Sequence, residues 1–151
     1  VEEILGDSVA REIARHFTHE IKRSYESMLL NYEQQDIHHD EAIIKAQEIL
    51  QKRYHEPVTM EAMAENLRMS VRTFNRRFRS AAGITPLQYL QEIRIDQAKQ
   101  LLKQSNLTIA EISFAVGYQD PSHFSGLFRK VAGVKPVEYR KLVRSKLFKV
   151  E

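Results

Sequence analysis

Cysteine is absent from the sequence, and glycine and proline are scarce, with five and four residues among 151. Without cysteine the chain can hold no disulfide framework, no thiolate zinc site and no cysteine nucleophile. No apolar run approaches the roughly 20 residues that a helix needs to span a bilayer, so we expect no membrane partner and a cytoplasmic location. Because few residues interrupt helices and 42% of the chain is hydrophobic, the composition predicts a mostly α-helical protein with a substantial core.

Charge is distributed unevenly along the chain. Residues 1–40 carry a net charge of −5, whereas residues 41–151 carry +8. Four arginines fall within residues 72–79, and residues 141–149 add four further cations. A basic block of this kind indicates a polyanionic partner, although many solvated helices are also basic. Charge alone therefore leaves nucleic acid and an ordinary solvated surface as alternatives.

The chain divides into two segments near residue 38. Apolar residues recur at four-residue spacing from Val9 to Tyr25, which predicts a helical segment within residues 7–34. The polar, aperiodic stretch 34–40 is typical of a linker, and a new helical pattern begins near Glu41 and stops before Pro57. We therefore expect a helical segment over residues 1–38 and a separate domain over residues 39–151.

An internal repeat is the most informative feature of the second segment. Aromatic, basic, glycine and proline positions match at a shift of 50 residues, and the positions before them match at a shift of 49. The pairs at 50 are Phe74/Phe124, Phe78/Phe128, Arg79/Arg129, Ala82/Ala132, Gly83/Gly133, Pro86/Pro136 and Tyr89/Tyr139; those at 49 are Thr59/Thr108, Met60/Ile109, Met63/Ile112, Leu67/Val116 and Met69/Tyr118. The domain is therefore predicted to use one supersecondary unit twice.

Each copy of the repeat is predicted to be a helix-turn-helix unit. In the first copy Thr59 caps one helix, and Ser70 caps a second helix that runs to about Ala81 and ends at Gly83. The corresponding signals of the second copy are a capping box, Thr108 with Glu111, and a cap followed by proline, Asp120 with Pro121.

A long helix is expected to join the two copies. It opens at residues 85–88 and runs to about Lys103, which is roughly 17 residues or about 26 Å. Its apolar face is predicted to hold the two units together and consists of Leu87, Leu90, Ile93 or Ile95, Ala98, Leu101 and Leu102.

The second helix of the first unit carries a basic stripe. Phe74 and Phe78 lie four residues apart and are expected to face the core. The other side carries, at spacing i, i+3, i+4 and i+7, Arg72, Asn75, Arg76 and Arg79, and residues 71–79 contain no acid. Arginine can form two hydrogen bonds to guanine and asparagine two to adenine in the major groove. The stripe therefore favours a DNA-recognition helix over a solvated face.

The repeat resembles the DNA-binding domain of the AraC/XylS family of bacterial transcription factors over about two-thirds of the chain. The family pattern is I-A-x-x-x-G-F/Y followed by F-x-x-x-F-[RK]-x-x-x-G-x-x-P-x-x-[YF]-R. The matching residues are Ile112-Ser113, Gly117-Tyr118, Phe124, Phe128, Arg129, Gly133, Pro136, Tyr139 and Arg140, with Ser113 departing from the usual alanine. The resemblance implies an all-α fold of seven helices, with two helix-turn-helix subdomains joined by a long linker helix. It also implies a sequence-specific regulator with double-stranded promoter DNA and RNA polymerase as partners.

Two recognition helices, about residues 71–81 and 121–131, are then expected to enter successive major grooves. The predicted base contacts are Arg72, Asn75 and Arg76 in the first helix and Ser122, His123, Ser125 and Gly126 in the second. The predicted phosphate contacts are Ser70, Thr73, Arg77, Arg79, Arg129, Lys130 and Lys135. Because hydroxyls discriminate poorly between bases, the first helix is predicted to read sequence and the second to position the protein.

Residues 1–38 resemble the segment that precedes this domain in one subgroup of the family. In that subgroup an N-terminal domain of the PfpI-like glutamine-amidotransferase fold is fused to it, and the stretch LGDSVAREIARHF is similar to the last helices of that domain. The resemblance implies that residues 1–38 are the end of a sensor domain, with an effector that the sequence does not identify, followed by a linker.

Other reactive residues form no recognisable catalytic or cofactor site. The groups His16, His19, Glu20 and His38, His39, Asp40 lack metal-site spacing, and no glycine-rich phosphate loop is present. Ser122 and His123 are adjacent on a helix and do not face each other. We therefore expect no metal, no cofactor and no enzymatic activity.

Two alternatives stay open. The repeat could instead be a helical protein–protein interaction module whose basic face is merely solvated. The basic tail, residues 140–149, is compatible both with a last amphipathic helix on the core and with an arm that contacts phosphates.

Overall fold

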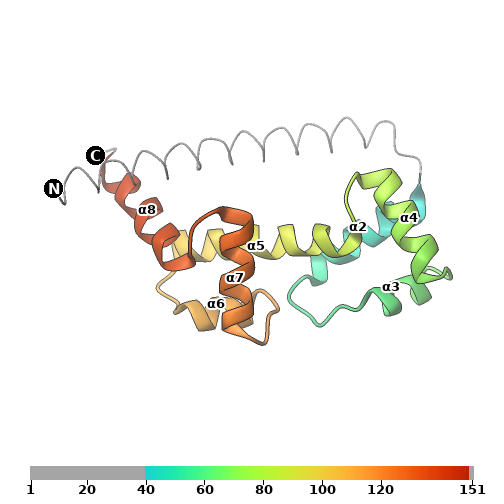
Figure 1. Ribbon diagram of the computed structural model, residues 1–151, viewed down its shortest axis with the longest axis horizontal. Coiled ribbons are helices and arrows are strands. Elements are labelled where there is room, and N and C mark those ends of the chain that lie inside the picture. The colour runs from blue at the N-terminus through green and yellow to red at the C-terminus, as the bar shows by residue number, and fades with distance from the viewer. Residues whose placement is uncertain (1–39, 150–151) are drawn as a thin grey trace.

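The computed structural model describes residues 40–149, with side chains through Ser145. This part of the chain forms helices only (Figure 1). They are α2 (Glu41–Arg53), α3 (Met60–Asn66), α4 (Val71–Ala82), α5 (Pro86–Gln104), α6 (Ile109–Ala115), α7 (Pro121–Ala132) and α8 (Pro136–Lys149). The predicted all-α fold is confirmed for these residues, whereas the helical segment expected over residues 1–38 lies outside them.

Polar side chains fix where five of the helices begin. An oxygen of each cap residue accepts a hydrogen bond from a backbone N–H in the first turn of its helix; the caps are Thr59, Ser70, Thr85, Thr108 and Asp120. At α5 the capping box is complete, because Gln88 Oε1 also accepts from the Thr85 N–H at 3.1 Å. The box predicted at α6 is only half formed, since the Glu111 carboxylate accepts from the Thr108 hydroxyl instead.

Two pairs of phenylalanines lie at the centres of two separate cores. Phe74 and Phe78 are fully buried on α4, and Phe124 and Phe128 are fully buried on α7. The second ring of each pair meets a tyrosine edge-on, with ring centroids 5.3 Å apart for Phe78 and Tyr89 and 5.5 Å for Phe128 and Tyr139. Edge-to-face pairs contribute about 0.5–1.5 kcal/mol beyond the area they bury. The repeat therefore extends from the sequence to the packing of both cores.

Helix α5 belongs to both cores. Its Leu90 packs in the core around Phe74 and Phe78, and its later residues pack in the core around Phe124 and Phe128. Three of these later residues repeat the buried positions of α2 at a shift of 52, and all six side chains are fully buried: Ile43/Ile95, Ala46/Ala98 and Leu50/Leu102. We call α2, α3, α4 and the first half of α5 the first unit, and the second half of α5, α6, α7 and α8 the second unit.

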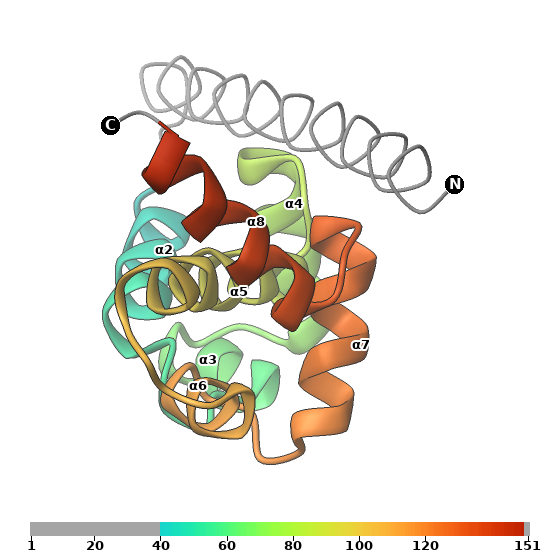
Figure 2. The ribbon, with the colours of Figure 1, turned by 90° about the vertical axis from the view of Figure 1, so that its left-hand side faces the viewer.

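The view along α5 shows how the two units are oriented (Figure 2). Helices α3 and α6, the first helices of the two helix-turn-helix motifs, both lie below α5 in this view. Helices α4 and α7, the second helices, both lie to its right. The two motifs therefore present their second helices toward the same side of the long helix.

The structure corrects the apolar face predicted for the long helix. Leu90, Ile95, Ala98 and Leu102 are buried as expected, but Leu87 is 51% exposed. Leu87 lies in the first turn of α5 and lines an open hollow beside α4 instead of a core. Sequence periodicity missed Arg94, a charged residue that is only 8% exposed in the middle of α5.

The beginning of the basic tail forms a helix on the core. Tyr139 and Val143 of α8 are buried in the second core. Arg140 and Arg144 bond backbone carbonyls near the C-terminal end of α5, with Arg140 Nε donating to Leu102 O at 3.2 Å and both arginines donating to Ser105 O. Burial lowers the pKa of Arg140 from its usual value. Of the two alternatives for the tail, the amphipathic helix is the one formed over residues 136–145.

Two glycines provide a test of how closely the units approach. Gly83 and Gly117 both have positive φ, +82° and +106°, but only Gly117 is crowded: a Cβ there would lie 2.8 Å from Tyr54 O. Gly83→Ala should lower the free energy of unfolding by about 1 kcal/mol through backbone strain alone. Gly117→Ala should lower it by about 3 kcal/mol, because strain and a backbone clash add. Urea unfolding followed by circular dichroism measures both, and equal losses would show that the first unit yields at this contact.

Candidate nucleic-acid interface

The buried face of α4 determines which of its side chains point outward. Because Phe74 and Phe78 are held in the core, the opposite side of the helix faces solvent. Arg72, Arg76 and Arg79 are exposed there, and Asn75 is half-buried. No acidic residue occurs in α4, so no charge within the helix compensates these arginines. The structure therefore brings the predicted stripe together on one accessible surface.

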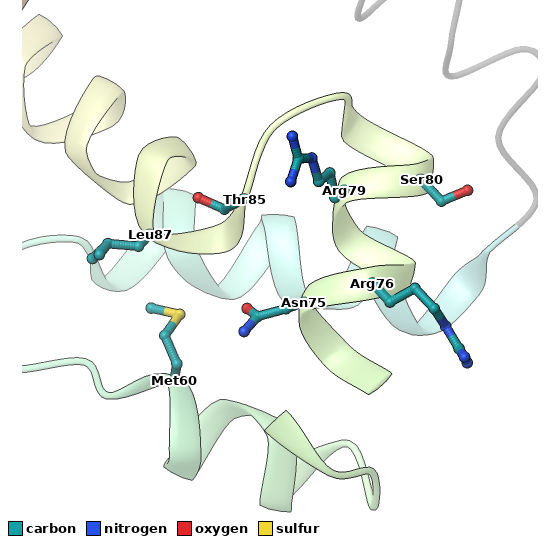
Figure 3. A pocket seen from close by; sticks show the side chains of 7 residues that line it. All are labelled: Met60, Asn75, Arg76, Arg79, Ser80, Thr85 and Leu87. Atoms are coloured by element: carbon teal, nitrogen blue, oxygen red, sulfur yellow. The ribbon is translucent and has the colours of Figure 1, made fainter. Parts of the chain in front are cut away.

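An open hollow of about 780 Å³ lies beside this stripe. Its lining comes from three helices and the turn between α4 and α5: Met60, Asn75, Arg76, Arg79, Ser80, Thr85 and Leu87. Figure 3 shows the Asn75 amide pointing into the hollow toward Met60, whereas the Arg76 guanidinium projects away from it. Asn75 and Arg76, which sequence spacing places side by side, thus diverge in space.

Met60, Thr85 and Leu87 were not among the residues predicted to contact DNA. Thr85 and Leu87 reach the hollow because the turn at Gly83 folds the start of α5 back beside α4, and Met60 reaches it from the start of α3. In the sequence, Leu87 and its repeat partner Val137 share a position directly after a proline, and the structure leaves both about half exposed.

Arg77 lies apart from the stripe and pairs with the start of α2. Its Nε and one terminal nitrogen donate to the two carboxylate oxygens of Asp40 at 2.9 and 2.6 Å. This hydrogen bonding raises the pKa of Arg77 above its usual value. The bidentate pair leaves the other terminal nitrogen of Arg77 outside these two bonds. As a phosphate contact, Arg77 stays a prediction.

The N-cap and the first turn of α4 carry two hydroxyls, those of Ser70 and Thr73. Ser70 is exposed and Thr73 is half-buried. The Ser70 hydroxyl donates to Thr73 Oγ1 at 2.9 Å and accepts from the Thr73 N–H at 3.1 Å. Both predicted phosphate contacts therefore lie at the N-terminal end of α4, where helix N–H groups favour an anion.

The corresponding surface of α7 has little charge near its start. Ser122 and His123 are exposed, Ser125 is half-buried, and nothing lies within 4 Å of a Cβ built on Gly126. The His123 ring meets the ring of Tyr118 edge-on, with centroids 5.9 Å apart. The cations Arg129, Lys130 and Lys135 are exposed toward the other end of α7 and the following turn. The difference between the two helices, inferred from the repeat, is present in the exposed side chains.

Residues 40–149 show no sign of a membrane-spanning helix or a metal site. None of the helices there has the length and apolar character needed to cross a bilayer. Histidine, aspartate and glutamate side chains in this range form no group of three or more that could hold a metal ion. The histidines of the two sequence groups weighed as metal ligands lie outside the described residues.

Comparison with known proteins identifies the family. Residues 63–142, slightly more than half of the chain, match the family described as "Helix-turn-helix domain". An uncharacterized HTH-type transcriptional regulator of Bacillus subtilis, YisR, is 35% identical over 68% of this chain and 36% of its own length. The HTH-type transcriptional activator RhaS of Escherichia fergusonii is 37% identical over 60% of this chain and 33% of its own. The chain thus spans about a third of the length of these relatives.

Solved structures of helix-turn-helix proteins are similar to this chain in both fold and sequence. The C-terminal domain of AraT, a response regulator from Geobacillus stearothermophilus, is 33% identical with a TM-score of 0.66, over 68% of this chain and 85% of that one. The DNA-binding domain of the global transcriptional factor AdpA, solved with a target DNA, is 35% identical with a TM-score of 0.66, over 69% of this chain and 94% of that one. The chain therefore belongs to the AraC/XylS-type helix-turn-helix family of sequence-specific DNA-binding transcriptional regulators.

Proposed function

We propose that α4 and α7 enter successive major grooves on one side of a promoter duplex, and that the protein acts there without catalytic activity. The observation that carries this proposal is the acid-free row of exposed arginines on α4, opposite its buried phenylalanines. The common direction of α4 and α7 supports it (Figure 2). A helix with its side chains is about 10–12 Å across and fits the major groove of B-DNA.

The two helices contribute differently to binding. On α4, Arg72, Asn75 and Arg76 contact base edges, where each bidentate contact gives about 1–3 kcal/mol of discrimination. On α7, base edges are met by Ser122, His123, Ser125 and Gly126, which discriminate less. Phosphates are held by Ser70, Thr73, Arg77, Arg79, Arg129, Lys130 and Lys135, which fix the register of the protein on the duplex.

The length of α5 sets a constraint on the DNA. Its 19 residues span about 28 Å at 1.5 Å per residue, whereas successive major grooves lie about 34 Å apart. A tilt of the recognition helices or a bend of the duplex makes up the difference. The site then covers about two helical turns without being a palindrome, because one chain supplies both helices.

The rest of the protein supplies regulation. The resemblance of residues 1–38 supports an N-terminal sensor domain of the PfpI-like fold, which responds to an effector. RhaS is described as a transcriptional activator, which supports contact of the present protein with RNA polymerase at the promoter.

Selection of bound duplexes from a random DNA pool tests the proposed function. The chain should enrich an asymmetric site of about two helical turns, and its affinity should fall linearly in log K against log salt with a slope of several units. Hydroxyl-radical footprinting of the selected site should show protection on one side of the duplex in both turns. Failure to enrich any sequence, or binding that ignores salt, would favour a protein–protein interaction module instead.

The asymmetry between the recognition helices can be measured by substitution. Arg76→Ala should abolish the preference for the particular bases that Arg76 contacts in one half of the selected site and cost about 1–3 kcal/mol there, because a bidentate contact is lost. Ser125→Ala should weaken binding slightly and evenly across sequences. Affinities on single-base variants of the site measure both effects. A stronger base preference under α7 than under α4 would contradict the division between reading and positioning.

The pairing of Arg77 with Asp40 gives Arg77 and Arg79 different expected effects. Arg79→Gln should lower the salt slope by about one unit and leave the melting temperature unchanged, because Arg79 is exposed. Arg77→Gln should lower the slope by less, because Asp40 already neutralises the charge, and should reduce the melting temperature. Salt titration and thermal unfolding measure the two effects. A full unit of slope lost with Arg77→Gln would show that the ion pair opens on DNA.

A further inference from the structure

The guanidinium of Arg94 lies between the two units. It extends from the middle of α5, and its Nε donates to Tyr54 O at 2.7 Å while a terminal nitrogen donates to Glu56 O at 3.0 Å. Both carbonyls lie just after the C-terminal end of α2, in the first unit. Arg94 therefore ties α5 to the segment that leaves α2.

The other side of the same guanidinium contacts the second unit. Its Cζ lies 4.9 Å from the centre of the Tyr118 ring, a distance typical of a cation–π interaction. A Cβ on Gly117 would lie 3.0 Å from both Nε and Cζ of Arg94, so the turn between α6 and α7 rests directly on the guanidinium. Burial raises the pKa of the Tyr118 phenol, while the positive charge of Arg94 acts in the opposite direction.

This contact continues to the second recognition helix. The Tyr118 ring meets the His123 ring edge-on, and His123 lies in the first turn of α7. A series of contacts thus runs from the end of α2 through Arg94 and Tyr118 to the start of α7. Because a buried charge is costly unless its hydrogen bonds are satisfied, the guanidinium favours a single arrangement of the segments around it.

We infer that Arg94 is a positioning residue that fixes the two recognition helices relative to each other and so sets the spacing of half-sites that the protein accepts. The inference rests on the proposed function, because it concerns how two helices share one duplex. The planar fork of arginine can bond two carbonyls and stack on a ring at once, whereas a lysine ammonium cannot reproduce this geometry. Without Arg94, α5 still joins the units and Gly117 still lies against Tyr54 O, but the hydrogen bonds and the ring contact that link the facing segments through the guanidinium are lost.

The repeat provides a matched control. At a shift of 50, Arg94 corresponds to Arg144, which bonds Ser105 O and Asn106 Oδ1 at the end of α5. Arg144 therefore makes the same kind of arginine–carbonyl contact, but within the second unit. Arg144→Met should affect stability without changing the geometry between the units.

The experiment compares binding of the 151-residue chain and its variants to duplexes in which the spacing of the two half-sites differs. The set contains the selected site and versions with one or two base pairs inserted or deleted between the half-sites. The wild type should lose about tenfold or more in affinity on a two-base-pair insertion, because contacts at one half-site are lost. Arg94→Met should bind the selected site several-fold more weakly but lose less than about threefold further on insertion. Arg94→Lys should resemble Arg94→Met, and Arg144→Met should keep the wild-type spacing profile.

A second variant keeps the inference testable if Arg94→Met unfolds. Tyr118→Met introduces methionine, the residue that the first repeat copy has at the equivalent position, Met69. It leaves the two carbonyl bonds of Arg94 in place, and it should also flatten the spacing profile. Thermal unfolding of each variant shows which of them are folded at the binding temperature.

The outcomes separate the inference from the function on which it rests. A wild type that binds no duplex in a salt-dependent manner would overturn the proposed function. A wild type that binds, together with folded Arg94 and Tyr118 variants that keep its spacing profile, would overturn only the positioning role. Equal flattening by Arg144→Met would also overturn it, because the effect would then follow general loss of stability.

Discussion

Helix α5 is the element on which the arrangement of the molecule depends, because its buried side chains are divided between two cores. Leu90 packs with Phe74 and Phe78, and Ile95, Ala98 and Leu102 pack with Phe124 and Phe128. An α-helix keeps its backbone hydrogen bonds within itself and behaves as a stiff rod over this length. Rotation of one helix-turn-helix unit about α5 would therefore expose one of the cores. Burial of these side chains holds α4 and α7 in a common direction.

Charge at the surface and charge between the units have different consequences. The arginines of α4 are exposed, so their charge is available to a polyanion at little desolvation cost. Arg94 is buried, and its charge is directed at backbone carbonyls and a tyrosine ring. Arg77 lies between these extremes, because Asp40 pairs with it at the edge of the basic surface. The same residue type thus contributes to binding, to positioning and to the attachment of α2.

Most of the local structure could be predicted from the sequence. The caps at Thr59, Ser70 and Asp120 and the buried phenylalanines all follow from patterns within a few residues. Glu111 is an exception. Its carboxylate accepts a hydrogen bond from the hydroxyl of Thr108 instead of from the backbone N–H of Thr108, which the capping box requires. The 50-residue repeat was also visible, as was a long helix that holds its two copies together, but the correspondence between α2 and the second half of this helix, α5, was not. Helix α5 aligns with α2 only at a shift of 52 residues, and the structure shows this alignment because the same three positions are fully buried in both helices.

The sequence by itself determined where the helices begin, which of their faces are apolar and which helix carries the arginine stripe, because capping and helical periodicity act over one or two turns. The tertiary structure decided which arginines pair with distant parts of the chain and which stay exposed. Arg77 meets Asp40 across 37 positions, and Arg94 meets Tyr54 across 40. It also decided that Leu87 faces the hollow beside α4 while Arg94 is buried. Helical period assigns a residue to a face, but only the neighbours that fold against that face determine whether the residue is buried, paired or exposed.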